Sequence, residues 1–203
     1  MGHITLRQLN GFDQTPAPLG GSTLVMIDFQ NTYTRGVMEL DGWQQALNAA
    51  ADLLARARKQ GSKVIHVIND GGPDTPYDVR AEIGQIHPQV APIDDEPIIV
   101  KTAPNALVGT KLAELLEEAG HNDVIVVGFM THMCVLFTAQ GIFLEGKRPT
   151  VVANACATRS LPCATRPCHA LPIEISSMQL HQGALATIAD LYGVVVSNSD
   201  ELG

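Results

Sequence analysis

Short apolar segments alternate with helical stretches along most of this chain, and this alternation limits the fold more than any other feature. Each segment is the length of a strand buried on both faces. The segments are residues 24–28, 64–68, 98–101, 124–127, 150–153 and 193–197. Strands of this kind, joined by helices, form parallel sheets that helices cover on both sides. The sequence therefore predicts an α/β fold: a three-layer, doubly wound, mainly parallel six-stranded sheet.

The length and charge of the chain indicate a single acidic domain. Its 203 residues suit one core, which we expect to span residues 22–203 after an N-terminal arm at 1–21. Thirteen basic against twenty-one acidic residues give a net charge of −8, which argues against nucleic acid or an anionic membrane as main partner. Neither a membrane-spanning run nor a signal-peptide pattern is seen, so we expect a cytoplasmic protein.

The four cysteines are expected to be free thiols. They are Cys134, Cys156, Cys163 and Cys168, and a chain of this length needs no disulfides for stability. Cys163 and Cys168, followed by His169, have no partner cluster at zinc-finger spacing, so we expect no structural zinc. A local disulfide between these two cysteines stays open.

Three predicted strands each deliver a reactive side chain at or just beyond the carboxyl end. Asp28 ends the first strand, Lys101 ends the third, and Cys134 follows the fourth. Parallel sheets bind ligands beyond the carboxyl ends of their strands, so the three side chains are expected to meet. Taken singly, each also has a structural explanation: a turn cap, a solvated strand end and a small buried side chain.

Cys134 lies in the first turn of a helical run that begins at Thr131, after Gly128 interrupts the fourth strand. Unpaired backbone N–H groups and the positive end of the helix dipole stabilise a thiolate there. The same amides are suited to binding the oxyanion formed when the sulfur attacks a carbonyl. The position therefore predicts a nucleophile beside an oxyanion hole.

Three segments resemble the isochorismatase-like cysteine hydrolases, a superfamily that includes nicotinamidases and N-carbamoylsarcosine amidohydrolases. They are LVMIDFQN at 24–31, IVKTAPNAL at 99–107 and GFMTHMCV at 128–135, and the similarity covers roughly residues 22–199. The resemblance implies that Cys134 is the nucleophile, Asp28 the general base and acid, and Lys101 a cation that orients Asp28 and favours the thiolate. It also implies a cis peptide between Phe129 and Met130, which would turn the Met130 and Cys134 amides toward one oxyanion.

Other residues near these segments are predicted to bind the substrate. Gln30 and Tyr33 follow the Asp28 strand, where the family places groups that line the pocket, and His132 lies two residues before Cys134. Asn105 follows Lys101 and is expected to shape the pocket through turn hydrogen bonds. Each of these residues has packing or surface exposure as its alternative role.

The loop after the second strand departs from the metal-binding members of the family, which hold a metal there with an acid and histidines. Here it contains Asp70, Asp74 and Asp78 but no histidine before His87. Because imidazole gives such sites their hold on transition metals, we predict no catalytic metal and no cofactor.

The retained Cys134 favours acyl transfer, since isochorismatases proper cleave a vinyl ether without a cysteine nucleophile. We therefore predict a hydrolase that cleaves a small amide, carbamoyl or lactam C–N bond through a thioester. The alternatives are vinyl ether hydrolysis and a non-catalytic binding or redox-sensing protein. Residues 158–176, with three prolines, are predicted to form a rim or lid that meets a second subunit, because the family implies a homo-oligomer, a dimer or tetramer.

Overall fold

The structure, a computed structural model, describes residues 3–162 and 174–203 and contains a six-stranded sheet. The strands lie in the order β3-β2-β1-β4-β5-β8, and all neighbouring pairs are parallel. Their bounds are Thr23–Ile27 for β1, Lys63–Asn69 for β2, Ile98–Lys101 for β3, Asp123–Phe129 for β4, Arg148–Ala157 for β5 and Val194–Val196 for β8. The predicted fold class, a doubly wound parallel α/β sheet, is confirmed.

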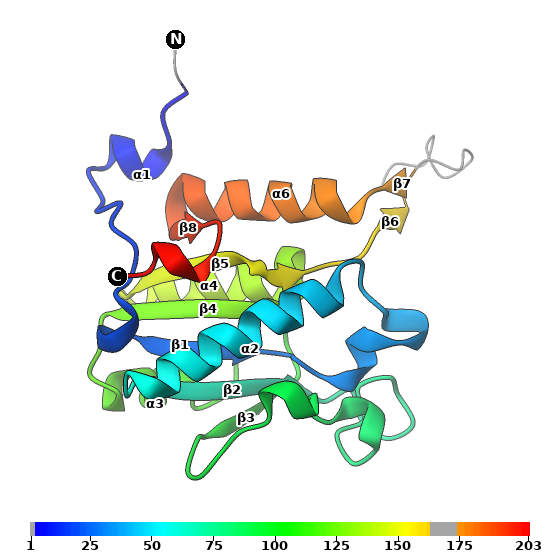
Figure 1. The fold of residues 1–203 in the computed structure, drawn as a ribbon. Helices are drawn as coiled ribbons and strands as arrows, with labels where there is room; N and C mark the ends of the chain where they lie inside the picture. Colours follow the sequence, from blue (N-terminus) through cyan, green and yellow to red (C-terminus); the bar gives the residue numbers. More distant parts are fainter. Residues whose placement is uncertain (1–2, 163–173) are drawn as a thin grey trace.

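Helices lie on both faces of the sheet and produce the three layers (Figure 1). In this view α2 (Trp43–Lys59) lies in front of the sheet, α4 (Leu136–Leu144) behind it, and α6 (Ser177–Thr187) along the edge formed by β5 and β8. The apolar side chains of α2 follow helical spacing and are buried as one stripe: Ala46, Leu47, Ala50, Leu53, Leu54 and Ala57. The other elements include α1 (Leu6–Leu9), α3 (Leu112–Glu118) and an antiparallel pair of β6 (Leu161–Pro162) and β7 (Glu174–Ile175).

Burial differs between the central strands and β3. All residues of β1 are buried, as are those of β4 after its first residue. In β3, by contrast, Ile98 and Val100 are each 50% exposed. The expectation that every strand is buried on both faces is therefore wrong for β3, because this strand lies at the edge of the sheet, where one face stays uncovered.

The carboxyl ends of the central strands meet at one edge of the sheet. Ile27 pairs with Val67 of β2 on one side and with Gly128 of β4 on the other. Asn69, the last residue of β2, pairs with Lys101 of β3. The residues that end or follow these strands are thus neighbours, as the sequence predicts.

Gly128 allows β4 to approach β1 closely. A Cβ atom at this position would lie 2.1 Å from the carbonyl oxygen of Ile27, and the φ angle of Gly128 is 144°. Only glycine suits both conditions. Gly128 does not end the strand as expected: β4 continues to Phe129, with an irregular register against β5 at this point.

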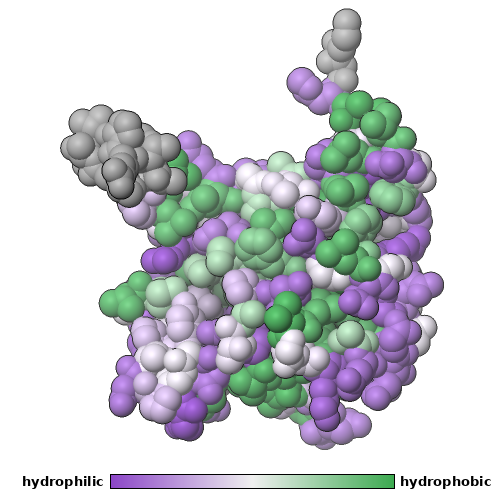
Figure 2. All heavy atoms as spheres, turned by 180° about the vertical axis from the view of Figure 1, so that it is seen from behind, coloured by the Kyte–Doolittle hydropathy of each residue, from purple (hydrophilic) through white to green (hydrophobic). Residues whose placement is uncertain are grey.

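The predicted N-terminal arm contains α1 and packs against the domain. The Arg7 side chain donates a hydrogen bond to the carbonyl of Leu191, and the Ala17 amide donates one to Thr150. Large apolar side chains on the arm remain exposed, namely Ile4, Leu6, Leu9 and Phe12. Figure 2 shows this apolar surface over α1. Among residues 3–162 and 174–203, no helix has the length and apolar character needed to cross a membrane.

Candidate active site

Asp28, Lys101 and Cys134 meet at the carboxyl edge of the sheet and are all buried. The Lys101 ammonium nitrogen Nζ lies 2.8 Å from Oδ2 of Asp28 and 3.2 Å from Sγ of Cys134. One cation thus contacts both the acid and the thiol. The structure brings together the three residues that the strand ends predicted, in the arrangement that the resemblance implied.

The Asp28 carboxylate and the Lys101 ammonium form a buried ion pair. Both carboxylate oxygens are fully buried, and the Lys101 ammonium 2.8 Å from Oδ2 is the charge that faces them. Burial raises the pKa of Asp28, and the neighbouring positive charge of Lys101 opposes this rise. A buried carboxylate whose pKa is raised by burial has lone pairs beyond those facing Lys101, so it is suited to accept a proton.

The surroundings of the Cys134 thiol oppose the thiolate that its helical turn and Lys101 are predicted to favour. Burial, followed by the negative charge of Asp28, raises the pKa of Cys134 to about 12, although Lys101 acts in the opposite direction. At neutral pH the resting group is therefore a thiol. Its nucleophilic form requires transfer of the proton, and the Asp28 carboxylate beside it is the available acceptor.

The turn that carries Cys134 is π-helical. It spans Thr131–Val135 and continues directly into α4, and the Val135 amide donates to the Met130 carbonyl at 3.3 Å. Such turns are rare and occur frequently at functional sites. The peptide bond between Phe129 and Met130 is cis, as the resemblance implied. The oxyanion hole built from the Met130 and Cys134 amides stays a prediction.

Two tyrosines form an aromatic wall beside the catalytic groups. Tyr33 is buried, and its ring centroid lies 5.8 Å from that of Tyr77 and 5.7 Å from that of Phe129. Burial and then the Asp28 charge raise the pKa of Tyr33, so its phenol stays neutral. Tyr77 is half-buried, and the charges of Cys134 and Asp28 contribute to the rise of its pKa after burial. The sequence analysis missed Tyr77; the signal was an aromatic residue in the loop after β2, which ends at the same sheet edge.

Arg159 is a second residue that the sequence analysis missed. It follows β5 two residues after Ala157, which pairs with Phe129 of β4. Its Nε atom is buried and has no hydrogen-bond partner among the described residues. After burial, the positive charge of Arg159 is the second cause that lowers the pKa of His132. Arg159 thus places a buried N–H group that has no partner in the described part of the chain at the same edge as Cys134.

The predicted substrate-binding residues separate into two groups. His132 is half-buried, and its Nδ1 atom is hydrogen-bonded to the hydroxyl of Thr158, the residue before Arg159. His132 and Tyr33 therefore both lie at the predicted site. Asn105 instead accepts a hydrogen bond from the Leu107 amide, and its contacts extend to Gly141, about two turns of helix beyond Cys134. The turn hydrogen bond was expected, and a role of Asn105 in shaping the pocket stays a prediction.

Gln30 also has a different role from the one predicted. Its amide nitrogen donates to the carbonyls of Asn69 at 2.9 Å and Gly84 at 2.7 Å, and its oxygen accepts from the Asn69 amide at 2.9 Å. These bonds use the side chain for the backbone of the loop after β2. The prediction that Gln30 binds the substrate is therefore corrected. Gln30 has a structural role, because both the nitrogen and the oxygen of its side-chain amide already have backbone partners.

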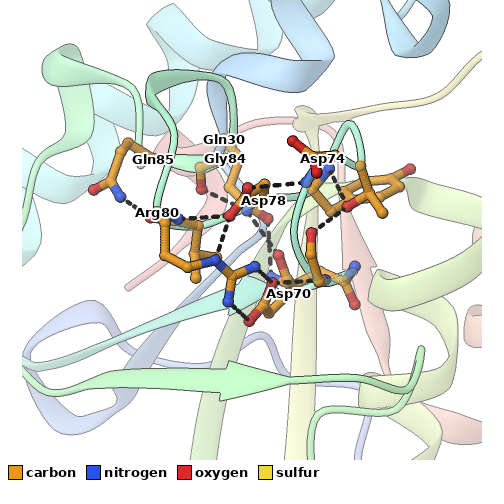
Figure 3. A network of polar contacts seen from close by, with 12 residues as sticks. Gln30, Asp70, Asp74, Asp78, Arg80, Gly84 and Gln85 are labelled. Carbon is orange, nitrogen blue, oxygen red and sulfur yellow. Dashed lines mark hydrogen bonds and ion pairs between the residues drawn. The ribbon is translucent and has the colours of Figure 1, made fainter.

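Two carboxylates of this loop, those of Asp70 and Asp78, are paired with an arginine (Figure 3). The Arg80 guanidinium donates to both oxygens of Asp70, at 3.2 and 3.0 Å, and lies 2.6 Å from Oδ1 of Asp78. In the described part of the chain, no three acidic, histidine or cysteine side chains are grouped so as to hold a metal ion. The donor set of the loop therefore does not fit a transition metal.

Cys156 lies apart from the triad. It is a buried free thiol that lines a cavity of about 650 Å³ between α2, α6 and β8, to which no triad residue contributes. Cys163, Cys168 and their undecided disulfide lie outside the described residues, as does most of the predicted rim at 158–176.

The fold is a doubly wound parallel sheet with helices on both faces, and the chain belongs to the isochorismatase family of hydrolases. Residues 22–200 match the family model described as the isochorismatase domain. The crystal structure of an isochorismatase from Pseudomonas putida KT2440 has a TM-score of 0.92 and 37% identity, covering 100% of each chain. Maleamate amidohydrolase of Pseudomonas putida is 29% identical over 209 residues, which cover 95% of this chain and 87% of the relative.

A third relative concerns localisation. The secreted isochorismatase effector Isc1 of Verticillium dahliae is 27% identical over 197 residues, covering 97% of this chain and 98% of the relative. The family thus includes a member named as secreted. A cytoplasmic location for this chain stays a prediction, as does its homo-oligomeric state.

Proposed function

We propose that this isochorismatase-family hydrolase cleaves a small amide or related C–N bond through a thioester on Cys134. The observation that carries the proposal is the contact of one buried ammonium, Lys101 Nζ, with both Sγ of Cys134 and the carboxylate of Asp28. Similarity to a maleamate amidohydrolase supports amide hydrolysis. A redox sensor or binding protein has no need of a buried acid and lysine beside the thiol.

The proposed reaction has two stages. Asp28 accepts the Cys134 proton while the sulfur attacks the substrate carbonyl carbon, and the Met130 and Cys134 amides bind the oxyanion. Asp28 then gives this proton to the leaving nitrogen as the C–N bond breaks, which leaves a thioester. In the second stage Asp28 accepts a proton from water and the water oxygen attacks the thioester carbon. The C–S bond then breaks, and the departing sulfur takes the proton from Asp28, which restores the thiol and the carboxylate and releases the acid. Lys101 stabilises the ionised form of Asp28 and the developing thiolate.

Arg159 supports a preference for substrates with an anionic group near the amide. The structure gives it no carboxylate partner within the described residues, and residues 163–173 contain no aspartate or glutamate. A guanidinium binds a carboxylate through two parallel hydrogen bonds. Arg159 therefore supplies donors for a carboxylate, while Tyr33 and Tyr77 pack against the rest of a small substrate.

The test is an assay of small amides in matched pairs, with and without a carboxylate, together with carbamoyl compounds and lactams. We expect release of the amine from at least one amide, faster for the carboxylate member of its pair, and a transient mass increase on the Cys134 peptide equal to the acyl group. Intact-protein and peptide mass spectrometry after rapid acid quenching detect the adduct. Turnover without an acyl adduct under conditions of rate-limiting deacylation would contradict the thioester.

Hydrolysis is expected to persist after metal removal. The loop after β2 binds its carboxylates through Arg80, and the backbone amides are proposed to stabilise the oxyanion, so no Lewis acid is required. Dialysis against a strong chelator, followed by elemental analysis and assay beside an untreated sample, measures this. Activity that disappears and returns with zinc, iron or manganese would show that the proposed mechanism is wrong.

A further inference from the structure

The loop between Asp70 and Gly84 contributes Tyr77 to the wall of the active site, and its own contacts explain how Tyr77 is held. The Gly71 amide donates to the Tyr77 carbonyl at 3.3 Å, which folds the loop back on itself. Gln30, two residues after Asp28, binds both Asn69 and Gly84. The two ends of the loop are thus fastened to the catalytic strand, whereas its middle depends on other contacts.

Those other contacts centre on Arg80, which joins the start of the loop to the residue after Tyr77 (Figure 3). Its guanidinium binds Asp70 through both oxygens and Asp78 through Oδ1. The same carboxylates accept backbone hydrogen bonds: Asp70 from Gly72 at 2.9 Å, and Asp78 from Asp74 at 3.1 Å and from Arg80 itself at 3.0 Å. Arg80 is therefore the cation that joins Asp70 and Asp78, and these two carboxylates in turn hold the loop backbone.

The setting makes this ion-pair network stronger than an ordinary surface pair. Isolated exposed ion pairs contribute little, but bidentate arginine contacts within a network contribute more. The side chains of Asp70 and Asp78 are only 20% and 12% exposed, whereas Arg80 is 52% exposed, so the strength comes from the bidentate geometry and the network rather than from burial. Without Arg80, two neighbouring carboxylates would repel each other and lose their hold on the Gly72 and Asp74 amides.

We infer that Arg80 is a positioning residue: its guanidinium, bound to Asp70 and Asp78, is a built-in cation that holds Tyr77 against Tyr33 at the substrate pocket. In this loop the guanidinium of Arg80 holds two carboxylates together and neutralises their repulsion, as a bound metal ion can do for a group of carboxylates. The effect of Arg80 on catalysis rests on the proposed function, whereas its effect on the conformation of the loop does not depend on that function.

The experiment compares Arg80→Ala and Arg80→Lys with Arg35→Ala as matched control. Arg35 pairs with Glu82 of the same loop, but both side chains are exposed and the pair touches neither Asp70 nor Asp78. Amide hydrogen exchange of peptides from residues 70–84 reports the loop without any need for activity. In Arg80→Ala we expect the amide exchange rates at Gly72 and Asp74 to rise roughly tenfold. This is the change in the opening equilibrium of the loop that the loss of one charge-assisted hydrogen bond predicts.

The kinetic readout separates positioning from a purely structural role. We expect Arg80→Ala to raise KM about tenfold, with kcat within about threefold of the wild type. Millimolar guanidinium ion should partly restore KM in Arg80→Ala and change nothing in the wild type or in Arg35→Ala. Arg80→Lys should lie between Arg80→Ala and the wild type, because lysine keeps the charge but not the bidentate geometry.

Two results would overturn the inference. One is loop exchange in Arg80→Ala equal to that in Arg35→Ala, and the other is faster exchange with KM unchanged, which would make Arg80 structural only. If the wild type hydrolyses none of the amides, the proposed function fails. The inference is then decided by loop exchange and by the rate at which iodoacetamide alkylates Cys134, which should rise in Arg80→Ala as the pocket wall loosens.

Discussion

Replacing Cys134 by alanine is expected to lower kcat/KM for the amide substrate by about 10⁴-fold or more, because no other group can form the thioester. The sulfur is buried at the carboxyl edge of the sheet and lies 3.2 Å from Lys101 Nζ. Steady-state assays at matched protein concentration, with thermal unfolding to confirm the fold, measure the loss. The change removes one buried sulfur atom, so the variant is expected to fold.

Cys156→Ala is the matched control for this prediction. Cys156 is also buried and its pKa is also raised to about 12 by burial, but it lines the cavity between α2, α6 and β8, to which no triad residue contributes. We expect this variant to keep its activity within about threefold, since only packing is altered. Full activity in Cys134→Ala would remove the thioester mechanism and favour the alternative without a cysteine nucleophile, vinyl ether hydrolysis.

Replacing Asp28 by asparagine is expected to lower turnover by roughly 10²- to 10⁴-fold, the range for loss of a general acid and base. Asparagine keeps the shape of the side chain but cannot accept the Cys134 proton. This proton transfer is needed because the thiol pKa is raised to about 12. Assays under saturating substrate measure the loss in turnover, and Asp52→Asn, on the exposed face of α2, controls for a charge change outside the site.

The pH dependence gives a second readout for Asp28. Burial raises its pKa above the ordinary value of 3.8, and below that pKa the carboxylate is protonated and cannot act as a base. In the wild type, kcat/KM should therefore fall as pH falls through the raised pKa. In Asp28→Asn the residual activity should lack this acid limb. An unchanged acid limb in the variant would assign the titration to another group and contradict the role of Asp28.

The sequence determined the fold and the three central residues because both depend on local patterns. Strand positions follow from apolar runs such as 124–127, and parallel strands carry their carboxyl ends to the same edge. Asp28, Lys101 and Cys134 were therefore predicted together without knowledge of the strand order. The resemblance of the segments around them added the cis peptide at Phe129 and the family, which the structure and the comparisons confirm.

The tertiary structure alone decided what surrounds these residues, because loops between strands pack by contacts that no local pattern reveals. The Gln30 side chain turned out to bind the backbone at Asn69 and Gly84, while Tyr77 and Arg159, from two different loops, lie at the site. The protonation state of Cys134 was likewise a tertiary property. Its helical turn favours a thiolate, but burial and the Asp28 charge, which only the folded chain brings to the sulfur, raise its pKa to about 12.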